Sequence, residues 1–527
     1  MSVIERLPFV GGEEPSTAPF LERAARWACD LEYRDVPRHV RRAATAQLTS
    51  TVGAGVWTLS HPLGERIAAR VNAGQRGDDA PFLGGDGRSV ADAAAGNAAL
   101  STALEFDDEI LGGPLGRSSV WVPLAYAEAT GADGERTLVA QVAANEVAGR
   151  LAAATAPSPF RDRGTPYAHA AGAAVGRAVV EGDDPETLSS ALASALSQPA
   201  RTLEASALGS EAAVWSASGP IRTGLEAVDI ARAGLSGGSD LVEADGGLLS
   251  TVADRPRPAF LDGFGERWHT RALTVAAHPV DAYVAAPVEA ALQVRGRFDR
   301  GRTSVERVDV HASLFTTVAD QRVAGYLAGP ESPPGALSCT VPFNVAAALV
   351  DGEHTPVQVG TRVGEAAIWR LAERVSVHQD GGFTRAAMAS EVPVGAMVCG
   401  TGPSIVTEAA THLGLRTTLR NLPTLLRFVR SRRLPADLST AEGRLGARVE
   451  VTTTDGRSVE ATIDRPTGFA GGPLAELRAV ARKKCRTGLQ STGIRESTAR
   501  ERVDRLLALD EVDRVSLGWL LDGGDRG

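Results

Sequence analysis

The spacing of hydrophobic positions changes partway along the chain. From residue 19 to about residue 240, apolar residues recur with the period of a helix, and few β-branched residues alternate with polar ones. Glycine-rich turns separate these periodic segments. Asp184 before Pro185 is typical of a helix start and predicts a helix from Pro185 to about Gln198. We therefore expect an α-helical bundle in this part of the chain.

The pattern alters near residues 261–265. From there, strands are predicted at 271–275, 304–311 and 374–377, and helices at 283–294 and 343–350. Strands that alternate with helices predict an α+β or βαβ unit. A β-hairpin with Asp455 and Gly456 at its turn is also predicted within 448–463.

The last segment, 473–521, is helical again, and we expect it to return to the bundle. A chain of 527 residues is too long for one core, which favours two domains. The predicted fold is therefore mainly α. A helical domain covers 1–264, a smaller α+β domain covers 265–465, and C-terminal helices over 466–527 rejoin the helical domain.

Composition narrows the class of protein. With 43% hydrophobic and 23% charged residues, the chain has the make-up of a soluble globular protein. Its net charge of −9, without a basic stripe among aromatic residues, argues against nucleic acid as a partner. No apolar run approaches the roughly 20 residues that cross a bilayer, so no membrane partner is expected. The N-terminus lacks a secretory pattern and the four cysteines lack paired spacing, which predicts a cytoplasmic protein.

The most informative local motif is an acidic cluster, Glu105 to Glu109, which joins an alanine-rich helix to a glycine-rich loop. Carboxylates this crowded cannot all be comfortably ionised, so at least one is expected to have a raised pKa, as a general acid or base requires. Phe106 is expected to point into the core, and Glu105, Asp108 and Glu109 to face a cleft at helical spacing. The alternative is a solvated helix end.

This segment resembles the signature region of the MmgE/PrpD family, which includes 2-methylcitrate dehydratase, cis-aconitate decarboxylase and iminodisuccinate epimerase. The resemblance is carried by Leu31–Gly55, Asn97–Ile110, Gly116–Ser118, Val122–Glu128, Gly172–Gln198, Ala231–Gly234 and Pro342–Gly352. It implies a helical domain and a smaller lid domain with the site in the cleft between them. It also implies a homodimer built through the helical domain and cofactor-free chemistry on small carboxylate substrates. Residues 392–439 are atypical of the family, and we interpret them as an insertion in the lid domain.

Such chemistry needs a base, an acid, and fixed positive charge that holds the substrate carboxylates. The aspartate that opens the family motif falls on Glu105, which keeps a carboxylate, and a threonine of the motif falls on Glu109. The family's first histidine falls on Gly116, with Arg117 and Ser118 directly after it. An arginine at this place can clamp a carboxylate with two parallel hydrogen bonds.

The remaining family positions are also replaced. The second histidine falls in a segment that has none, and the nearest imidazole is His169. The two lysines fall on Thr223, beside Arg222, and on Ala276, close to His278. Histidines can move protons near neutral pH. A structural histidine at 278 and a surface charge at 222 are the alternative interpretations.

The candidate catalytic residues are Glu105, Asp108, Glu109, His169 and His278, and the candidate substrate-binding residues are Arg117, Ser118, Arg222 and Thr223. No metal site is predicted, because the histidines are dispersed and no Cys-x-x-Cys occurs. No cofactor is expected either.

Two hypotheses for function result. The first is a cofactor-independent lyase, a dehydratase of a small carboxylate-bearing metabolite in a specialised, biosynthetic pathway, with decarboxylation or epimerisation of a related carboxylate as alternatives. The second is a family member that kept the dimer but no longer catalyses a reaction. A working site requires Glu105, Arg117, His169, Arg222 and His278 to converge on one accessible cleft.

Overall fold

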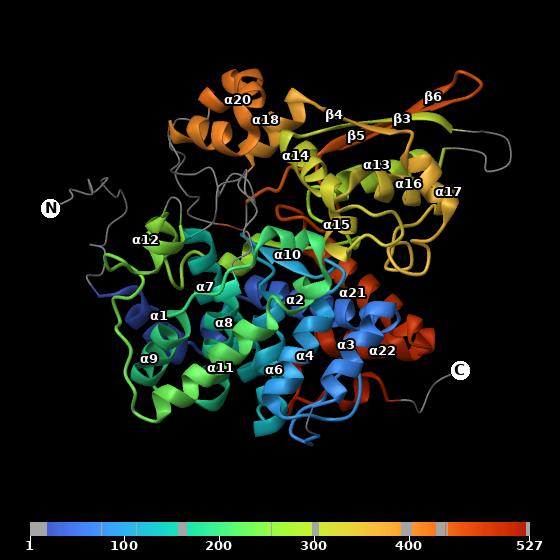
Figure 1. The fold of residues 1–527 in the computed structure, drawn as a ribbon. Helices are drawn as coiled ribbons and strands as arrows, with labels where there is room; N and C mark the ends of the chain where they lie inside the picture. Colours follow the sequence, from blue (N-terminus) through green and yellow to red (C-terminus); the bar gives the residue numbers. More distant parts are fainter. Residues whose placement is uncertain are drawn as a thin grey trace.

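The computed structural model describes residues 18–74, 76–111, 113–155, 166–253, 256–297, 305–390, 403–427, 438 and 441–522. Over these residues the chain is mainly helical, with a small two-stranded ladder and a four-stranded sheet (Figure 1). The predicted fold class, mainly α with a smaller α+β part, is therefore confirmed.

The helical part of the chain is formed by both ends of the sequence. Its described helices and strands are α1 (Phe20–Asp30), α2 (Arg38–Leu59), α3 (Pro62–Asn72), α4 (Val90–Thr102), β1 (Asp108–Ile110), α5 (Gly116–Ser119), α6 (Trp121–Thr130), α7 (Gly134–Ala154), α8 (Pro166–Glu181), α9 (Pro185–Leu196), α10 (Glu204–Gly209), α11 (Ser218–Arg232), α12 (Leu248–Val252), β2 (Leu273–Val275), α21 (Leu474–Ser491) and α22 (Glu496–Leu507). The C-terminal helices α21 and α22 lie against α2 (Figure 1).

The α+β part lies on one side of this bundle in Figure 1. Its described elements are α13 (Ala285–Arg295), β3 (Val305–Ala312), α14 (Leu314–Val323), α15 (Pro334–Cys339), α16 (Val341–Asp351), α17 (Ala366–Ala372), β4 (Val375–Gln379), α18 (Gly381–Ala389), α20 (Ser404–Arg427), β5 (Ala447–Thr453) and β6 (Ser458–Ile463). The sheet order is β4-β3-β5-β6, with β3 and β4 parallel and the other pairs antiparallel.

Several local predictions are confirmed. The Asp184 side chain accepts hydrogen bonds from the amides of Glu186 and Thr187 at the start of α9. Strands β5 and β6 form the expected hairpin, and Gly456 has a φ of 82°, which glycine adopts without strain. The first predicted strand is shorter than expected, because residues His269–Ala272 form a 3-10 turn and β2 starts only at Leu273.

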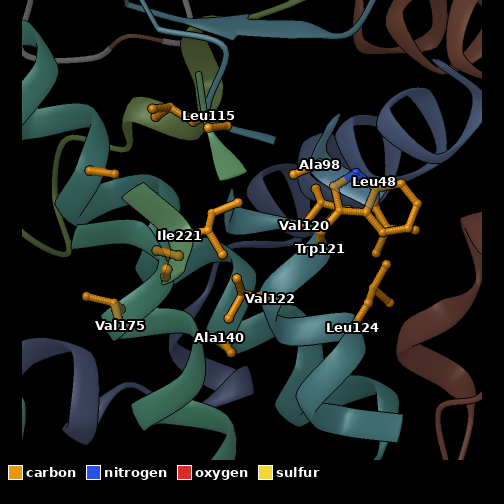
Figure 2. Close-up of a cluster of buried hydrophobic side chains, with 14 of the residues drawn as sticks. Leu48, Ala98, Leu115, Val120, Trp121, Val122, Leu124, Ala140, Val175 and Ile221 are labelled. Atoms are coloured by element: carbon orange, nitrogen blue, oxygen red, sulfur yellow. The ribbon is translucent and has the colours of Figure 1, made fainter. Parts of the chain in front are cut away.

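Two hydrophobic cores organise these elements. The larger joins residues from Phe20 to Val275 with residues from Leu438 to Leu520, and the second lies between Val280 and Phe469. In Figure 2, side chains from α2, α4, α6, α7, α8 and α11 meet in one cluster of the larger core. We propose that the two cores correspond to the two expected domains, but with other boundaries than 264/265 and 465/466, because Trp268 to Val275, Leu438 and Ala441 belong to the larger core and Phe469 to the second.

The predicted insertion at 392–439 is described only over 403–427 and at Leu438. There residues Ser404–Arg427 form α20, which is broken at Gly414. Across all the described helices, none is both long and apolar enough to span a membrane.

The close approach of α2 and α21 gives a first testable prediction. A Cβ atom on Gly53 would lie 2.7 Å from the Cα atom of Cys485, so Gly53→Ala requires the two helices to move apart. We expect the unfolding free energy to fall by about 1–3 kcal/mol in urea denaturation. Gly219 in α11 has nothing within 4 Å of an added Cβ, so Gly219→Ala is the matched control and should not destabilise the chain.

Candidate active site

The acidic segment leaves α4 through a turn and enters strand β1. Helix α4 ends at Thr102, and Glu105 has a φ of 47°, an uncommon backbone conformation for a residue with a side chain. Asp108 then pairs with Val275 in the β1–β2 ladder. The expected helical spacing of Glu105, Asp108 and Glu109 is therefore wrong, because strand pairing with a distant segment sets the conformation here.

Arg117, on the short helix α5, joins two of the carboxylates. Its Nε donates to Asp107 Oδ2 over 2.7 Å, and its Nη2 donates to Glu105 Oε2 over 3.2 Å. The Arg117 side chain is 7% exposed, whereas that of Glu105 is 42% exposed. Burial lowers the pKa of Arg117, but the charges of Asp107 and Glu105 outweigh burial and raise the pKa above its usual value. Arg117 is therefore a fixed cation that holds Glu105 at the edge of a buried cluster.

Asp108 is hydrogen-bonded to helix α2 and not to Arg117. Its carboxylate accepts hydrogen bonds from Gln47 Nε2 at 2.8 Å, from Thr51 Oγ1 at 3.0 Å and from the Gly116 amide at 3.3 Å. Burial, and then the charge of Asp107, raise the pKa of Asp108 to about 6 despite these bonds. The carboxylate with the raised pKa in this crowded segment is therefore the buried Asp108, although a pKa of about 6 leaves it mostly ionised at pH 7.

Sequence reasoning missed Lys484, a buried cation on α21. Its Nζ donates to Ser50 Oγ at 2.8 Å and to the carbonyl oxygens of Phe106 and Asp107. Nζ also lies 4.2 Å from the centre of the Phe106 ring, whose side chain is buried as expected. Burial lowers the pKa of Lys484 to about 7, while the charge of Asp107 opposes this shift. Lys484 thus ties the C-terminal helix to the acidic turn.

One signal in the sequence pointed to Lys484. The buried positions of α21 recur at helical spacing, at Leu477, Ala481 and Gly488, and Lys484 falls on the same stripe. A lysine on an apolar stripe must find acceptors inside the protein, because burying an unpaired charge is costly. The partners themselves are hundreds of residues away, so the pattern alone could not identify them.

His169 on α8 contacts Ser118, the residue that follows Arg117 in the sequence. The His169 Nδ1 lies 3.1 Å from Ser118 Oγ, and the histidine is buried. Burial, together with the charge of Arg117, lowers the pKa of His169 to about 3, so the ring is neutral near pH 7. The segment 156–165 before α8, on which the family's second histidine falls, lies outside the described residues.

His278 is held near the acidic turn by the end of the β1–β2 ladder. The amide of Ala276, two residues earlier, donates to the Asp107 carbonyl over 3.2 Å. His278 Nδ1 lies 2.9 Å from the carbonyl oxygen of His354. Since a carbonyl can only accept, Nδ1 carries the proton and Nε2 carries the lone pair. Burial lowers the pKa of His278 to about 4, with the nearby lysines Lys483 and Lys484 adding to the shift.

A comparison with known protein families matches the N-terminal half of the chain. Residues 22–261 match the model of the MmgE/PrpD N-terminal domain. This part of the chain is an MmgE/PrpD N-terminal domain. The family includes dehydratases, so the match indicates an enzyme role of this or a related type. A search of curated proteins returned no match. The match covers the acidic turn, Arg117 and His169, and it ends before His278 and Lys484.

The structure leaves no room for a side chain at Gly116, where the family resemblance places a histidine. A Cβ atom on Gly116 would lie 2.0 Å from Asp108 Oδ1 and 2.4 Å from Thr51 Oγ1. No side chain fits there while Asp108 keeps its present hydrogen bonds. A histidine at this position, as the family resemblance implies, would therefore require the Asp108 network to rearrange.

Two predicted substrate-binding residues lie apart from the cluster. Arg222 and Thr223 are on an exposed face of α11. Arg222 pairs with Asp92 over 2.6 Å in the first turn of α4, roughly 15 Å along that helix from its end at Thr102, beyond which Glu105 lies. We correct the expectation that Arg222 converges on the site, because the family position that suggested it faces solvent here.

The last predicted residue, Glu109, is half-buried in β1. Since side chains alternate along a strand, Glu109 points to the face opposite Asp108. Among all the residues that the structure describes, the acidic turn included, no three His, Cys, Asp or Glu side chains are grouped so that they could hold a metal ion.

The lowered pKa of Lys484 predicts that the stability of the fold depends on pH. The fold lowers its pKa from 10.5 to about 7, so between these values the unfolded chain binds more protons than the folded one. The unfolding free energy should therefore rise with pH across this window, by up to about 1.4 kcal/mol per pH unit. Urea denaturation at a series of pH values should show this slope flattened in Lys484→Met. Lys483→Met, at the exposed neighbouring position, should keep the slope.

Proposed function

We propose that the protein is a cofactor-independent lyase that removes water from a small carboxylate-bearing metabolite. The observation that carries the proposal is Arg117, which holds the half-exposed Glu105 at the edge of a buried polar cluster. The uncommon backbone conformation of Glu105 supports it, because strain of this kind gathers at functional sites.

The remaining donor of Arg117 is suited to the substrate. Its Nε and Nη2 bind the chain's own carboxylates, but within the described residues Nη1 has no hydrogen-bond partner. Nη1 is proposed to bind a substrate carboxylate, which also stabilises negative charge that develops on the neighbouring carbon.

Glu105 is proposed to act on that carbon. Its carboxylate takes the proton from the carbon next to the bound carboxylate, and the electron pair forms the new double bond as the hydroxyl leaves. The departing hydroxyl receives the same proton from Glu105 and leaves as water, so the carboxylate is regenerated. His278 Nε2, which has a lone pair and no partner in the described chain, accepts a hydrogen bond from the substrate hydroxyl.

The other buried groups are positioning residues. Lys484 has three acceptors from the protein, and Asp108 has three donors, so neither reaches a substrate. They fix the turn that carries Glu105. We further propose, from the family resemblance, a homodimer formed through the helical part. Light scattering should then give about twice the chain mass of 54.8 kDa, and a monomer mass would contradict this.

The test is a panel of small hydroxy di- and tricarboxylates incubated with the purified protein in D2O. NMR should show deuterium at the carbon next to a carboxylate, together with an unsaturated product, for at least one compound. Methylcitrate and cis-aconitate should be turned over slowly, because the family's cationic positions are replaced at Thr223 and Ala276. Release of CO2 or inversion without loss of water would reassign the reaction, and no exchange with any compound would favour a non-catalytic protein.

A further inference from the structure

A basic cavity lies at the start of α2, apart from the acidic turn. It has a volume of about 480 Å³ and is bounded by α2, α21 and the 3-10 turn Leu509–Glu511. Four arginines line it: Arg38, Arg41, Arg42 and Arg478. Such a concentration of positive charge is unexpected in a chain with a net charge of −9.

These arginines are not paired with carboxylates. Within the described residues, the side chains of Arg38 and Arg42 make no hydrogen bond or ion pair. The guanidinium carbon of Arg41 lies 4.1 Å from the centre of the Tyr33 ring, and its Nε is buried without a partner. Arg478 donates from Nη1 to Thr45 Oγ1 at 2.8 Å and to the Arg42 carbonyl at 3.3 Å, both uncharged acceptors.

The carboxylates at the rim do not balance this charge. Asp510 and Glu511 line the cavity, and Asp510 Oδ2 accepts a hydrogen bond from the Tyr33 hydroxyl at 2.6 Å. Four cations against two anions leave two positive charges uncompensated. Burial, and then the charges of Arg42 and Arg482, lower the pKa of Arg478, although the charge of Asp510 acts in the opposite direction.

We propose that this cavity binds a small multivalent oxyanion, either a polycarboxylate or a phosphorylated metabolite. Guanidinium groups bind carboxylate and phosphate through two parallel hydrogen bonds, and several converge here. The volume lies within the usual range for small-molecule sites.

The cavity shares its two helices with the acidic turn. Helix α2 runs from Arg42 at the cavity to Gln47 and Thr51, which bind Asp108. Helix α21 runs from Arg478 at the cavity to Lys484. An anion that bridges Arg42 and Arg478 therefore fixes the relative position of both helices and acts as an effector. The effector role rests on the proposed function, whereas the binding does not.

Isothermal titration calorimetry on the full chain, with pyrophosphate and with citrate at constant ionic strength, tests the site. We expect saturable binding of at least one anion at one site per chain. Arg38→Gln combined with Arg42→Gln should weaken it tenfold or more. Both positions are exposed, so the variant should keep its circular dichroism and melting temperature. Arg222→Gln, which removes another exposed arginine, is the control and should bind as the wild type does.

The results of these titrations identify the ligand class or overturn the proposal. Binding of pyrophosphate alone identifies a phosphorylated ligand, and binding of citrate alone a polycarboxylate. Because citrate could also occupy the acidic turn, only the binding that the double variant removes is assigned to the cavity. No saturable binding of either anion, or equal binding by wild type and double variant, overturns the proposal. Since heat is measured without turnover, this result is independent of whether the proposed lyase reaction occurs.

Discussion

Glu105→Gln is expected to lower kcat by a hundredfold or more on any substrate that the panel identifies. The change keeps the size of the side chain and a hydrogen-bonding oxygen for Arg117 but removes the carboxylate that takes the proton, and general bases typically contribute this much. Deuterium exchange next to the substrate carboxylate should fall in the same proportion, because it reports the same step.

Glu109→Gln is the matched control for this experiment. Glu109 lies four residues along the same segment, on the face of β1 opposite Asp108, and the proposal gives it no chemical step. Its kcat should stay within about threefold of the wild type, well under the usual contribution of a general base. A folded Glu105→Gln variant with full activity would instead move the chemistry to His278 or His169.

Arg117→Met should be the most destabilising single change at the site. It leaves Asp107 buried without its cation, since the Asp107 carboxylate is 5% exposed and receives two hydrogen bonds from Arg117. Breaking one partner out of a buried pair costs about 3–5 kcal/mol, which urea denaturation would report.

Arg222→Met provides the comparison for a solvent-exposed pair. Arg222 is 50% exposed and bound to Asp92, so its loss should cost less than about 1 kcal/mol. In the double variant Arg117→Met with Asp107→Asn, much of the lost stability should return, because no buried charge is then left unpaired. A loss below about 1 kcal/mol for Arg117→Met alone would show that Asp107 finds another partner.

The sequence was sufficient for most of the fold because the signals there are local. Asp184 caps α9 with its own neighbours, and Gly456 turns a hairpin whose strands are adjacent in the chain. The same locality explains why Glu105, Arg117 and Ser118 were found together, since only thirteen positions separate the first from the last.

The errors have non-local causes. The acidic segment continues as a strand and not as a helix, because β1 pairs with β2, which lies more than 160 residues away. Lys484 reaches the carbonyl of Phe106 across 378 positions. His278 depends on the carbonyl of His354 for its tautomer. The periodicity of the sequence cannot predict these long-range contacts, because each one depends on how separate elements pack in three dimensions.

Lys484 also bears on when the site is completed during synthesis. The acidic turn and most of its partners are translated early, but the buried ammonium that accompanies them comes from α21, near the end of the described chain. Until α21 has been made, Gly53 and its neighbours on α2 lack the helix that covers them, and the carbonyl of Phe106 lacks its donor. The nascent polypeptide therefore cannot complete this buried cluster while the ribosome is still making the α+β part, and the proposed activity would require that α21 has docked.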